Sequence, residues 1–265
     1  MPRPFTIPGN AFVSFDRVEK WFGDLSVVAP SFTLDVRREE FVVFLGPSGC
    51  GKTTLMRMVG GLDTPSVGEI RLEGRPIGKP DRRRGMVFQS YSSFPWLTVA
   101  GNVAFGMKYR NDLTHAQKRE RCAHYLDLVG LTDFADAFPS AVSGGMRQRI
   151  AIARTLAAGS DILLMDEPFG ALDTQLRESL QVELRRIQQQ DTKTIIFVTH
   201  DVEEAVFLAD RIILFSPRPT HIVAEFDIGA ELGAERPLAL RDSAAFFELK
   251  SRVLALVRNN VETSQ

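Results

Sequence analysis

Residues 46–53 are Gly46-Pro47-Ser48-Gly49-Cys50-Gly51-Lys52-Thr53, which fits the phosphate-loop pattern G-x-x-x-x-G-K-[ST]. The stretch before it, from Glu40 to Leu45, is apolar and rich in β-branched and aromatic residues, as in a strand buried on both faces of a parallel sheet. A helix is predicted from Thr53 to Val59, with Gly60-Gly61 as its stop. Strand, glycine loop and helix in this order are the context that the motif requires.

The residue types in this loop suit a triphosphate. Glycines allow the backbone to turn its N–H groups around phosphate oxygens, and the helix N-terminus adds a positive dipole end. We expect Lys52 to reach the β- and γ-phosphates of ATP and the Thr53 hydroxyl to bind Mg²⁺. Cys50 is interpreted as a small residue that fits the loop. The residues predicted to line the nucleotide are Gly46, Pro47, Ser48, Gly49, Cys50, Gly51, Lys52, Thr53 and Thr54.

A second buried strand is predicted in Asp161-Ile162-Leu163-Leu164-Met165-Asp166-Glu167-Pro168, and it ends in the two acids Asp166 and Glu167. A carboxylate at the tip of a central strand supplies the oxygen ligand that Mg²⁺ needs, so Asp166 is predicted to bind the metal. Glu167 is then placed to orient and deprotonate the attacking water. The alternative is an acidic turn without a chemical role, which the phosphate loop elsewhere in the chain disfavours.

Two more strand ends carry candidate polar residues. His200 follows the apolar run Thr194–Thr199, and the carboxyl edge of such a sheet faces the ligand crevice. There His200 can hydrogen-bond a γ-phosphate oxygen, although a lone histidine is more often structural. Gln89 ends the short strand Gly85–Phe88, and its amide is expected to touch Mg²⁺ or the attacking water.

A serine-glycine-glycine turn lies between these motifs, in Val142-Ser143-Gly144-Gly145-Met146-Arg147-Gln148. Ser143 can cap a helix running from Gly144 to about Ala158. An exposed helix N-terminus with glycine backbone beside it is an anion site.

This order of motifs resembles the ATP-binding subunits of ABC transporters. The matching elements span most of the chain: the phosphate loop, Gln89, residues 142–148, Asp166-Glu167, Ala171-Leu172-Asp173 and His200. The chain departs from the usual pattern at Val142, Met146 and Gly170, where Leu, Gln and Ser are commoner. None of these changes removes an expected phosphate contact.

The resemblance implies how two subunits share ATP. Ser143, Gly144 and Gly145 would bind the γ-phosphate held by the opposite subunit, so that two ATP molecules lie between two head-to-tail subunits. Asp173 would lie in a segment that crosses this interface. An aromatic residue upstream of the phosphate loop would stack on adenine, and either Phe22 or its neighbour Trp21 fits that place.

Two stretches resemble one group of importers, those for nitrate, sulfonate and taurine. They are Pro95-Trp96-Leu97-Thr98-Val99 and Ser216-Pro217-Arg218-Pro219, the latter followed by Ile222-Val223. The resemblance implies an ATP-hydrolysing subunit that works with a second ATP-binding subunit, with transmembrane permease subunits and indirectly with a solute-binding protein. Exposed Phe94, Trp96 and Leu97 would receive a short coupling helix of the permease, because aromatic anchors dominate interfaces. The transported solute, expected to be small and anionic, never touches this subunit.

Composition agrees with a peripheral protein on the cytoplasmic face of the cell (inner) membrane. The chain has 265 residues, 44% of them hydrophobic, and a formal net charge of −1, so no basic surface indicates nucleic acid. Cys50 and Cys122 are far apart, which fits a reducing cytosol. We find no window of ~18 apolar residues and no signal-peptide core.

The predicted fold class is α/β: a phosphate-loop ATPase core with a mostly parallel sheet, an antiparallel β subdomain and an inserted helical subdomain. Residues 1–10 are expected to be flexible, and residues 11–265 to form a single domain, with the helical subdomain at about 90–158 and a tail at about 216–265. Arg211–Phe215 is predicted to be the final core strand, and Ser243–Val257 an amphipathic helix that packs back on the domain.

Two further helices are predicted from short-range sequence patterns. Thr114 and Gln117 form a capping box for a helix through about Val129. Asp173 or Thr174 can cap a helix whose apolar face comprises Leu176, Leu180, Leu184 and Ile187.

Other functions remain open at this point. A soluble ABC-type ATPase in DNA repair or translation usually adds coiled coils, zinc modules or a second cassette, and the sequence contains none of these. Export is a variant of the transporter hypothesis. A binding module with a dead ATPase would lack a catalytic residue, yet Lys52, Asp166, Glu167 and His200 are all present.

Overall fold

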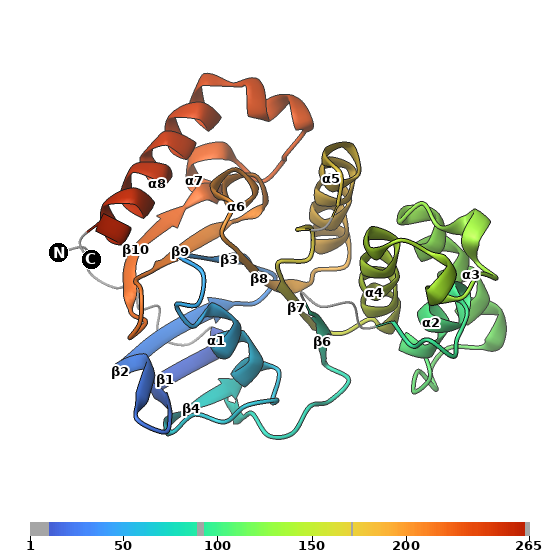
Figure 1. The fold of residues 1–265 in the computed structure, drawn as a ribbon, viewed down its shortest axis with the longest axis horizontal. Helices are drawn as coiled ribbons and strands as arrows, with labels where there is room; N and C mark the ends of the chain where they lie inside the picture. Colours follow the sequence, from blue (N-terminus) through green and yellow to red (C-terminus); the bar gives the residue numbers. More distant parts are fainter. Residues whose placement is uncertain (1–10, 89–92, 171, 263–265) are drawn as a thin grey trace. The chain divides into compact units, whose positions relative to one another are not determined.

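The computed structural model describes residues 11–88, 93–170 and 172–262 (Figure 1). Gln89 and Ala171 therefore lie outside the described residues. The chain divides into two compact units: unit 1 comprises Met1–Asp81 and Gln188–Gln265, and unit 2 comprises Arg82–Ile187. The single domain predicted from the sequence, with its subdomain and tail boundaries, stays a prediction.

An antiparallel sheet forms the first layer of unit 1, as the sequence predicted. Its strands are β1 (Ala11–Phe22), β2 (Leu25–Arg37), β4 (Val67–Leu72) and β5 (Arg75–Pro76), in the order β2-β1-β4-β5. β1 pairs with both β2 and β4, and its buried side chains include Phe12, Val13, Phe15 and Val18. Register shifts along β1 mark bulges, which bend the strand.

Buried parallel strands form the core of unit 1. β3 (Phe41–Leu45) pairs in parallel with β8 (Thr194–Thr199) and β9 (Arg211–Phe215), and every residue of these three strands is buried. The continuous apolar runs of β3 and β8 were what predicted them. The helix α1 (Lys52–Val59) follows β3, and the helix α6 (Val202–Leu208) follows β8.

The predicted core strand Arg211–Phe215 is confirmed, but the sequence did not predict the strand that follows it. β10 (Ile222–Asp227) pairs antiparallel with β9 and extends the sheet. Most of its side chains are half-buried, because it is an edge strand, and its sequence lacks the continuous apolar run of the central strands. Beyond it come α7 (Ile228–Leu232), the 3₁₀ turn η3 (Leu238–Asp242) and α8 (Ala244–Glu262).

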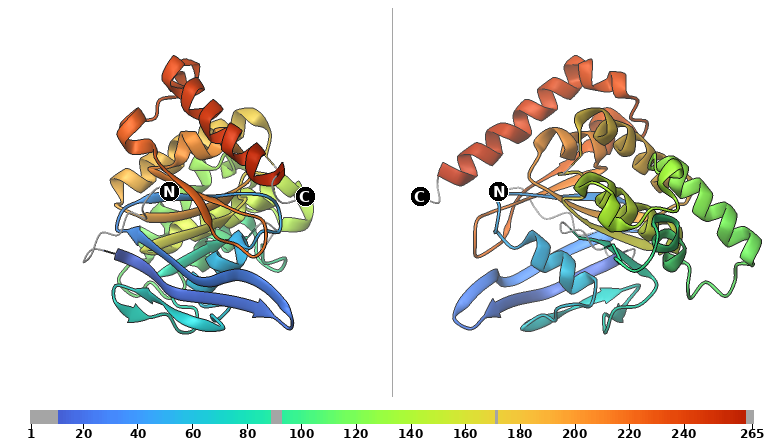
Figure 2. Two further views of the ribbon diagram at one scale, coloured as in Figure 1. Left: turned by 90° about the vertical axis from the view of Figure 1, so that its left-hand side faces the viewer. Right: turned by 45° about the vertical axis from the view of Figure 1, so that its right-hand side comes forward.

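The C-terminal helix α8, red in Figures 1 and 2, runs five residues past the predicted end at Val257. Phe246, Leu249 and Val253 are buried, which confirms that it packs back on its own unit. Lys250 Nζ lies 3.0 Å from a carboxylate oxygen of Glu203 on α6.

A buried ion network joins four strands or strand ends of unit 1. Arg211 Nε donates to Glu40 at 2.8 Å, and its Nη1 donates to Glu225 at 2.9 Å. Its Nη2 donates to the carbonyl oxygen of Asp35. Burial acts to lower the pKa of Arg211, but the carboxylates of Glu40 and Glu225 outweigh it and raise that pKa. Arg211 therefore stays charged inside the unit and neutralises two acids.

Arg211→Ala is expected to lower the free energy of unfolding by about 3–5 kcal/mol, because it leaves the buried carboxylate of Glu40 without its counter-charge. Chemical denaturation followed by circular dichroism measures the loss. Arg252→Ala is the matched control, since Arg252 forms an exposed pair with Glu231 and such pairs contribute little. Equal losses in both variants would contradict the role given to the network.

Unit 2 contains a pair of parallel strands and several helices. β6 (Arg84–Val87) pairs with β7 (Ile162–Asp166), with Val87 opposite Met165. The helices are α2 (Val99–Gly106), α3 (His115–Leu128), α4 (Gly144–Ala158) and α5 (Thr174–Gln190, whose last residues belong to unit 1), with 3₁₀ turns η1 (Thr132–Phe134) and η2 (Pro139–Ala141). The capping box of Thr114 and Gln117 is confirmed. Among the described residues, no helix has the length and apolar character needed to cross a membrane.

Candidate functional site

The phosphate loop joins β3 to α1 in unit 1. No side chain caps the N-terminus of α1, where Gly51 occupies the N-cap position. Gly51 has φ +122°, and a Cβ there would lie 2.6 Å from Thr220 Oγ1, so only glycine fits. Ser48, Gly49 and Thr53 are exposed. The loop thus presents an uncapped helix start to solvent, as an anion site requires.

Lys52 lies across the loop rather than out in solvent. Its Nζ donates to the carbonyl oxygens of Gly46 and Pro47, both at 2.8 Å, and only 4% of the residue is exposed. Cys50 is buried, and its Sγ lies 3.8 Å from the same Nζ. The ammonium group is therefore held inside the loop by carbonyl oxygens.

His200 is brought beside the phosphate loop by strand register. The last residues of β3 and β8, Leu45 and Thr199, are paired, so Gly46 and His200 each come one residue past that pair. His200 is exposed, and the next residue, Asp201, caps α6 through its side chain. The predicted His200 position at the carboxyl edge of the sheet is thus observed.

Phe22 lies at the end of the β1–β2 hairpin, paired with Leu25. The residue is 50% exposed, and Lys20 Nζ lies 4.6 Å from its ring centroid. Trp21 is also exposed. Both candidates for adenine stacking therefore present aromatic surface, and the choice between them stays a prediction.

Asp166 and Glu167 stand at the carboxyl end of β7 in unit 2. Asp166 is buried. Glu167 has φ +44°, in the left-handed region that non-glycine residues rarely adopt. Such conformations cost about 1–3 kcal/mol and concentrate at functional sites. The sequence did not predict this strain.

The Ser143 cap of α4 is confirmed. Its side chain accepts a hydrogen bond from the Met146 N–H at 3.2 Å. Ser143 is exposed, and Gly144 and Gly145 form the first turn of the helix. Arg147 Nη1 donates to the carbonyl oxygen of Val142 at 2.9 Å, which holds the residue before the cap.

Asp173 caps α5, one of the two alternatives that the sequence left open. Its Oδ1 accepts from the Leu176 N–H at 3.0 Å. Burial lowers the pKa of Arg149 on α4, and the charge of Asp173 acts in the opposite direction. Whether Asp173 also contacts a second subunit stays a prediction.

Three side-chain hydrogen bonds join α4 and Ser160, two residues beyond it, to β6 and the residues that flank β6. Gln148 Nε2 donates to the carbonyl oxygen of Phe88 at 3.3 Å, and Thr155 Oγ1 donates to that of Met86 at 3.2 Å. Ser160 Oγ donates to the carbonyl oxygen of Arg82 at 3.0 Å. Gln148 is only 1% exposed. The sequence analysis missed these contacts, for which the only signal was polar residues on an otherwise apolar helix.

An aromatic cluster lies on the outside of unit 2. The ring centroid of Phe94 lies 5.4 Å from that of Trp96 and 4.6 Å from that of Phe105. Trp96 is 70% exposed as predicted, whereas Phe94 and Leu97, which were also predicted to be exposed, are half-buried. Fully buried Asn102 fixes the backbone beneath, since it bonds both the N–H and the carbonyl oxygen of Phe94. The guanidinium of Arg154 lies 4.8 Å above the Phe94 ring.

The structure thus groups the predicted residues in two sets. Unit 1 holds Phe22, the phosphate loop with Thr54, and His200; unit 2 holds Asp166, Glu167, residues 143–145 and Asp173. Gln89 lies outside the described residues. Within those residues, no group of three or more His, Cys, Asp or Glu side chains is close enough to hold a metal ion by itself.

Known proteins with similar sequences are ATP-binding proteins, and several of them are named as parts of importers. A family model described as ABC transporter matches residues 30–170. An ATP-binding protein of Brucella abortus (strain 2308) is 46% identical over 91% of both chains. The nitrate import ATP-binding protein NrtD of Synechocystis sp. is 44% identical, covering 88% of this chain and 89% of that one. The taurine import ATP-binding protein TauB of Rhizobium johnstonii is 44% identical, over 86% and 87%.

Solved structures agree with the fold. A dimeric ATP-binding cassette in a post-hydrolysis state, bound to ADP and Pi, matches with a TM-score of 0.73 and 32% identity, over 82% of this chain and 98% of that one.

Proposed function

Because the chain belongs to the ABC transporter family and is an ATP-hydrolysing cassette, we propose that it powers a membrane importer for a small anionic solute. Support for the solute class comes from the two relatives named for nitrate and taurine import, which align over most of their length. Both solutes carry an oxyanion group. The soluble alternative in DNA repair or translation finds no support among these relatives.

In unit 1, the phosphate loop holds the ATP phosphates. Its backbone N–H groups and the uncapped start of α1 face the anion. Lys52 exchanges its bonds with the loop carbonyls for bonds with phosphate oxygens, which compete well because they are charged. Phe22 stacks on adenine, and His200 donates to the γ-phosphate.

In unit 2, Glu167 is the general base that takes a proton from the attacking water. Thr53, Asp166 and Gln89 offer a hydroxyl, a carboxylate and an amide oxygen, the hard oxygen donors that Mg²⁺ takes. When bound, the metal neutralises charge on the phosphate oxygens. The phosphate oxygens of the nucleotide would supply further oxygen ligands of the same kind.

A second cassette completes each ATP site. The N-terminus of α4 at Ser143, Gly144 and Gly145 can bind an anion. The ATP of the same subunit is assigned to the phosphate loop, so this helix start is left for another phosphate group. A related cassette has been solved as a dimer with ADP and Pi. We therefore assign these residues to the γ-phosphate held by the opposite subunit.

The permease docks on the aromatic cluster of Phe94, Trp96 and Phe105. The exposed rings of Trp96 and Phe105, which pack on half-buried Phe94, are the observation that carries the importer proposal, since large exposed aromatic side chains on a rigid base mark interaction sites. The subunit would thereby be held, as a peripheral protein, at the cytoplasmic face of the membrane.

Trp96→Ala is expected to weaken association with the permease about tenfold or more, because truncation of a central aromatic anchor typically costs 2 kcal/mol or more. The tagged chain is purified from detergent-solubilised membranes, and the co-purifying multi-span protein is quantified. Phe247→Ala is the matched control, since Phe247 on α8 is 65% exposed. Co-purification with nucleic acid or ribosomes instead of a membrane protein would refute the importer function.

A further inference from the structure

The loop 216–221, which joins β9 to β10, lies against the phosphate loop. Thr220 Oγ1 donates to the carbonyl oxygen of Cys50. The Thr220 N–H donates to the carbonyl oxygen of Val27 at 2.8 Å, and the Ala29 N–H donates to that of Thr220 at 3.0 Å. The loop is therefore fixed both to the nucleotide motif and to β2.

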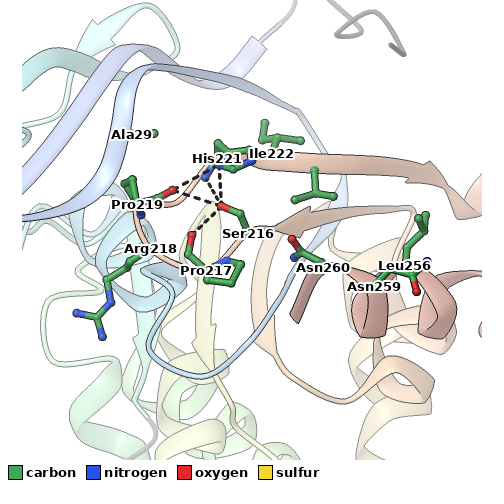
Figure 3. A pocket seen from close by; sticks show the side chains of 11 residues that line it. Ala29, Ser216, Pro217, Arg218, Pro219, His221, Ile222, Leu256, Asn259 and Asn260 are labelled. Carbon is green, nitrogen blue, oxygen red and sulfur yellow. Dashed lines mark hydrogen bonds between the residues drawn. The ribbon is translucent and has the colours of Figure 1, made fainter. Parts of the chain in front are cut away.

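Hydrogen bonds within the loop make it rigid. Ser216 is buried, and its Oγ accepts from the His221 N–H at 2.9 Å and donates to the carbonyl oxygen of Pro217 at 2.8 Å (Figure 3). Asn260 of α8 donates to the carbonyl oxygen of Phe215 at 2.9 Å, at the entrance to the loop. On one side the loop borders a cavity of about 670 Å³.

Arg218 is the exposed cation of this loop. Figure 3 shows its side chain extended away from the other residues that line the cavity. Its Nη2 lies 3.0 Å from the position that a Cβ on Gly49 would occupy, and Gly49 has φ +73°. The guanidinium thus rests on the exposed rim of the phosphate loop.

The charge of Arg218 has no protein counter-charge in the structure. None of the carboxylates in residues 11–88, 93–170 and 172–262 forms an ion pair with it. A planar guanidinium binds phosphate oxygens with two parallel hydrogen bonds, and such charge-assisted bonds are about twice as strong as neutral ones. A triphosphate bound in the phosphate loop would bring phosphate oxygens next to Gly49, on which this guanidinium rests.

We propose that Arg218 is a nucleotide-binding residue that contacts the phosphate chain of ATP bound in the phosphate loop of its own subunit. This inference rests on the proposed function, in which the loop holds ATP. Attachment through Thr220 fixes the backbone that carries Arg218 before the nucleotide arrives. Binding then has to order only the side chain of Arg218 and not its backbone.

The test compares Arg218→Gln with Arg218→Lys. Gln keeps most of the side-chain length without the charge, whereas Lys keeps the charge. We expect Arg218→Gln to weaken ATP affinity about three- to tenfold at low salt, and Arg218→Lys to stay within about twofold of wild type. The effect of Arg218→Gln should shrink in 1 M salt, where the Debye length falls to about 3 Å. Competition with a fluorescent nucleotide measures the affinities.

Arg252→Gln is the matched control, because it removes one exposed arginine charge from the same unit. Wild-type affinity in Arg218→Gln would overturn the inference. Equal weakening in Arg218→Gln and Arg218→Lys, or unfolding of either exposed-site variant, would also overturn it, since both indicate packing on Gly49 rather than charge. A wild-type protein that fails to bind ATP would instead refute the proposed function.

Discussion

Glu167→Gln is expected to slow ATP hydrolysis at least about a hundredfold while ATP affinity stays close to wild type. A positioned general base contributes roughly 10²–10⁴ in rate, and the amide of Gln cannot take a proton from water. The variant should therefore accumulate as an ATP-bound dimer. Phosphate release measures the rate, and size-exclusion chromatography with light scattering measures the dimer, in the assembled transporter where the isolated subunit turns over slowly.

The substitution Glu167→Gln changes the chemistry of the side chain without changing the backbone strain at this position. At φ +44° the backbone is left-handed, which costs conformational energy for any residue with a Cβ. Glu and Gln bear the same cost, so the substitution does not change the backbone strain. Glu183→Gln is the control, since it neutralises another unit 2 carboxylate, one paired with Arg186 on the surface of α5. A Glu167→Gln enzyme with near wild-type turnover would mean that another group is the base.

Ser143→Arg is expected to abolish ATP-driven dimerisation while each subunit still binds ATP. The long side chain would fill the space in front of the α4 N-terminus, where the Met146 N–H now donates to Ser143 Oγ. The dimer fraction should fall at least about tenfold, because an anion site at a helix start depends on open access to its N–H groups. Light scattering of a Glu167→Gln background at saturating ATP gives the dimer fraction.

Ser143→Ala is the control that distinguishes loss of the capping hydrogen bond from steric blocking by the arginine side chain. It removes the capping oxygen at a cost of about 1 kcal/mol of stability but leaves the amides open. We expect it to dimerise far better than Ser143→Arg. Normal dimerisation of Ser143→Arg would rule out contact between this helix start and the partner's ATP.

Much of the fold could be predicted because its signals are local. β3, β7 and β8 are continuous apolar runs buried along their whole length. The caps at Thr114 and Ser143 depend on residues only three positions away, so short sequence windows contain all the information. The order of these elements was enough to indicate the family.

Features that depend on distant partners could not be predicted. β10 is half-buried at a sheet edge and shows no continuous apolar run. The bond from Gln148 to Phe88 spans 60 positions, and the pairing of Arg211 with Glu40 spans 171. Arg218 was used only as part of a group signature, because nothing in the sequence places it beside Gly49. The left-handed backbone of Glu167 likewise has no residue-type signal.

The hydrogen bonds that join α4 to β6 and its flanks have a consequence for how motion could pass through unit 2. Arg154, which covers the Phe94 ring, and Ser143 lie on the same helix, about 16 Å apart from the rise per residue. Gln148 and Thr155 bind that helix to the strand that leads toward Gln89. A displacement of Arg154 at the aromatic cluster would therefore move the Ser143 end of α4, for which we propose a contact with ATP. It would also move the strand before Gln89 through the two hydrogen bonds. Under the proposed docking of the permease and the proposed phosphate contact of Ser143, a single helix would therefore link the two sites directly.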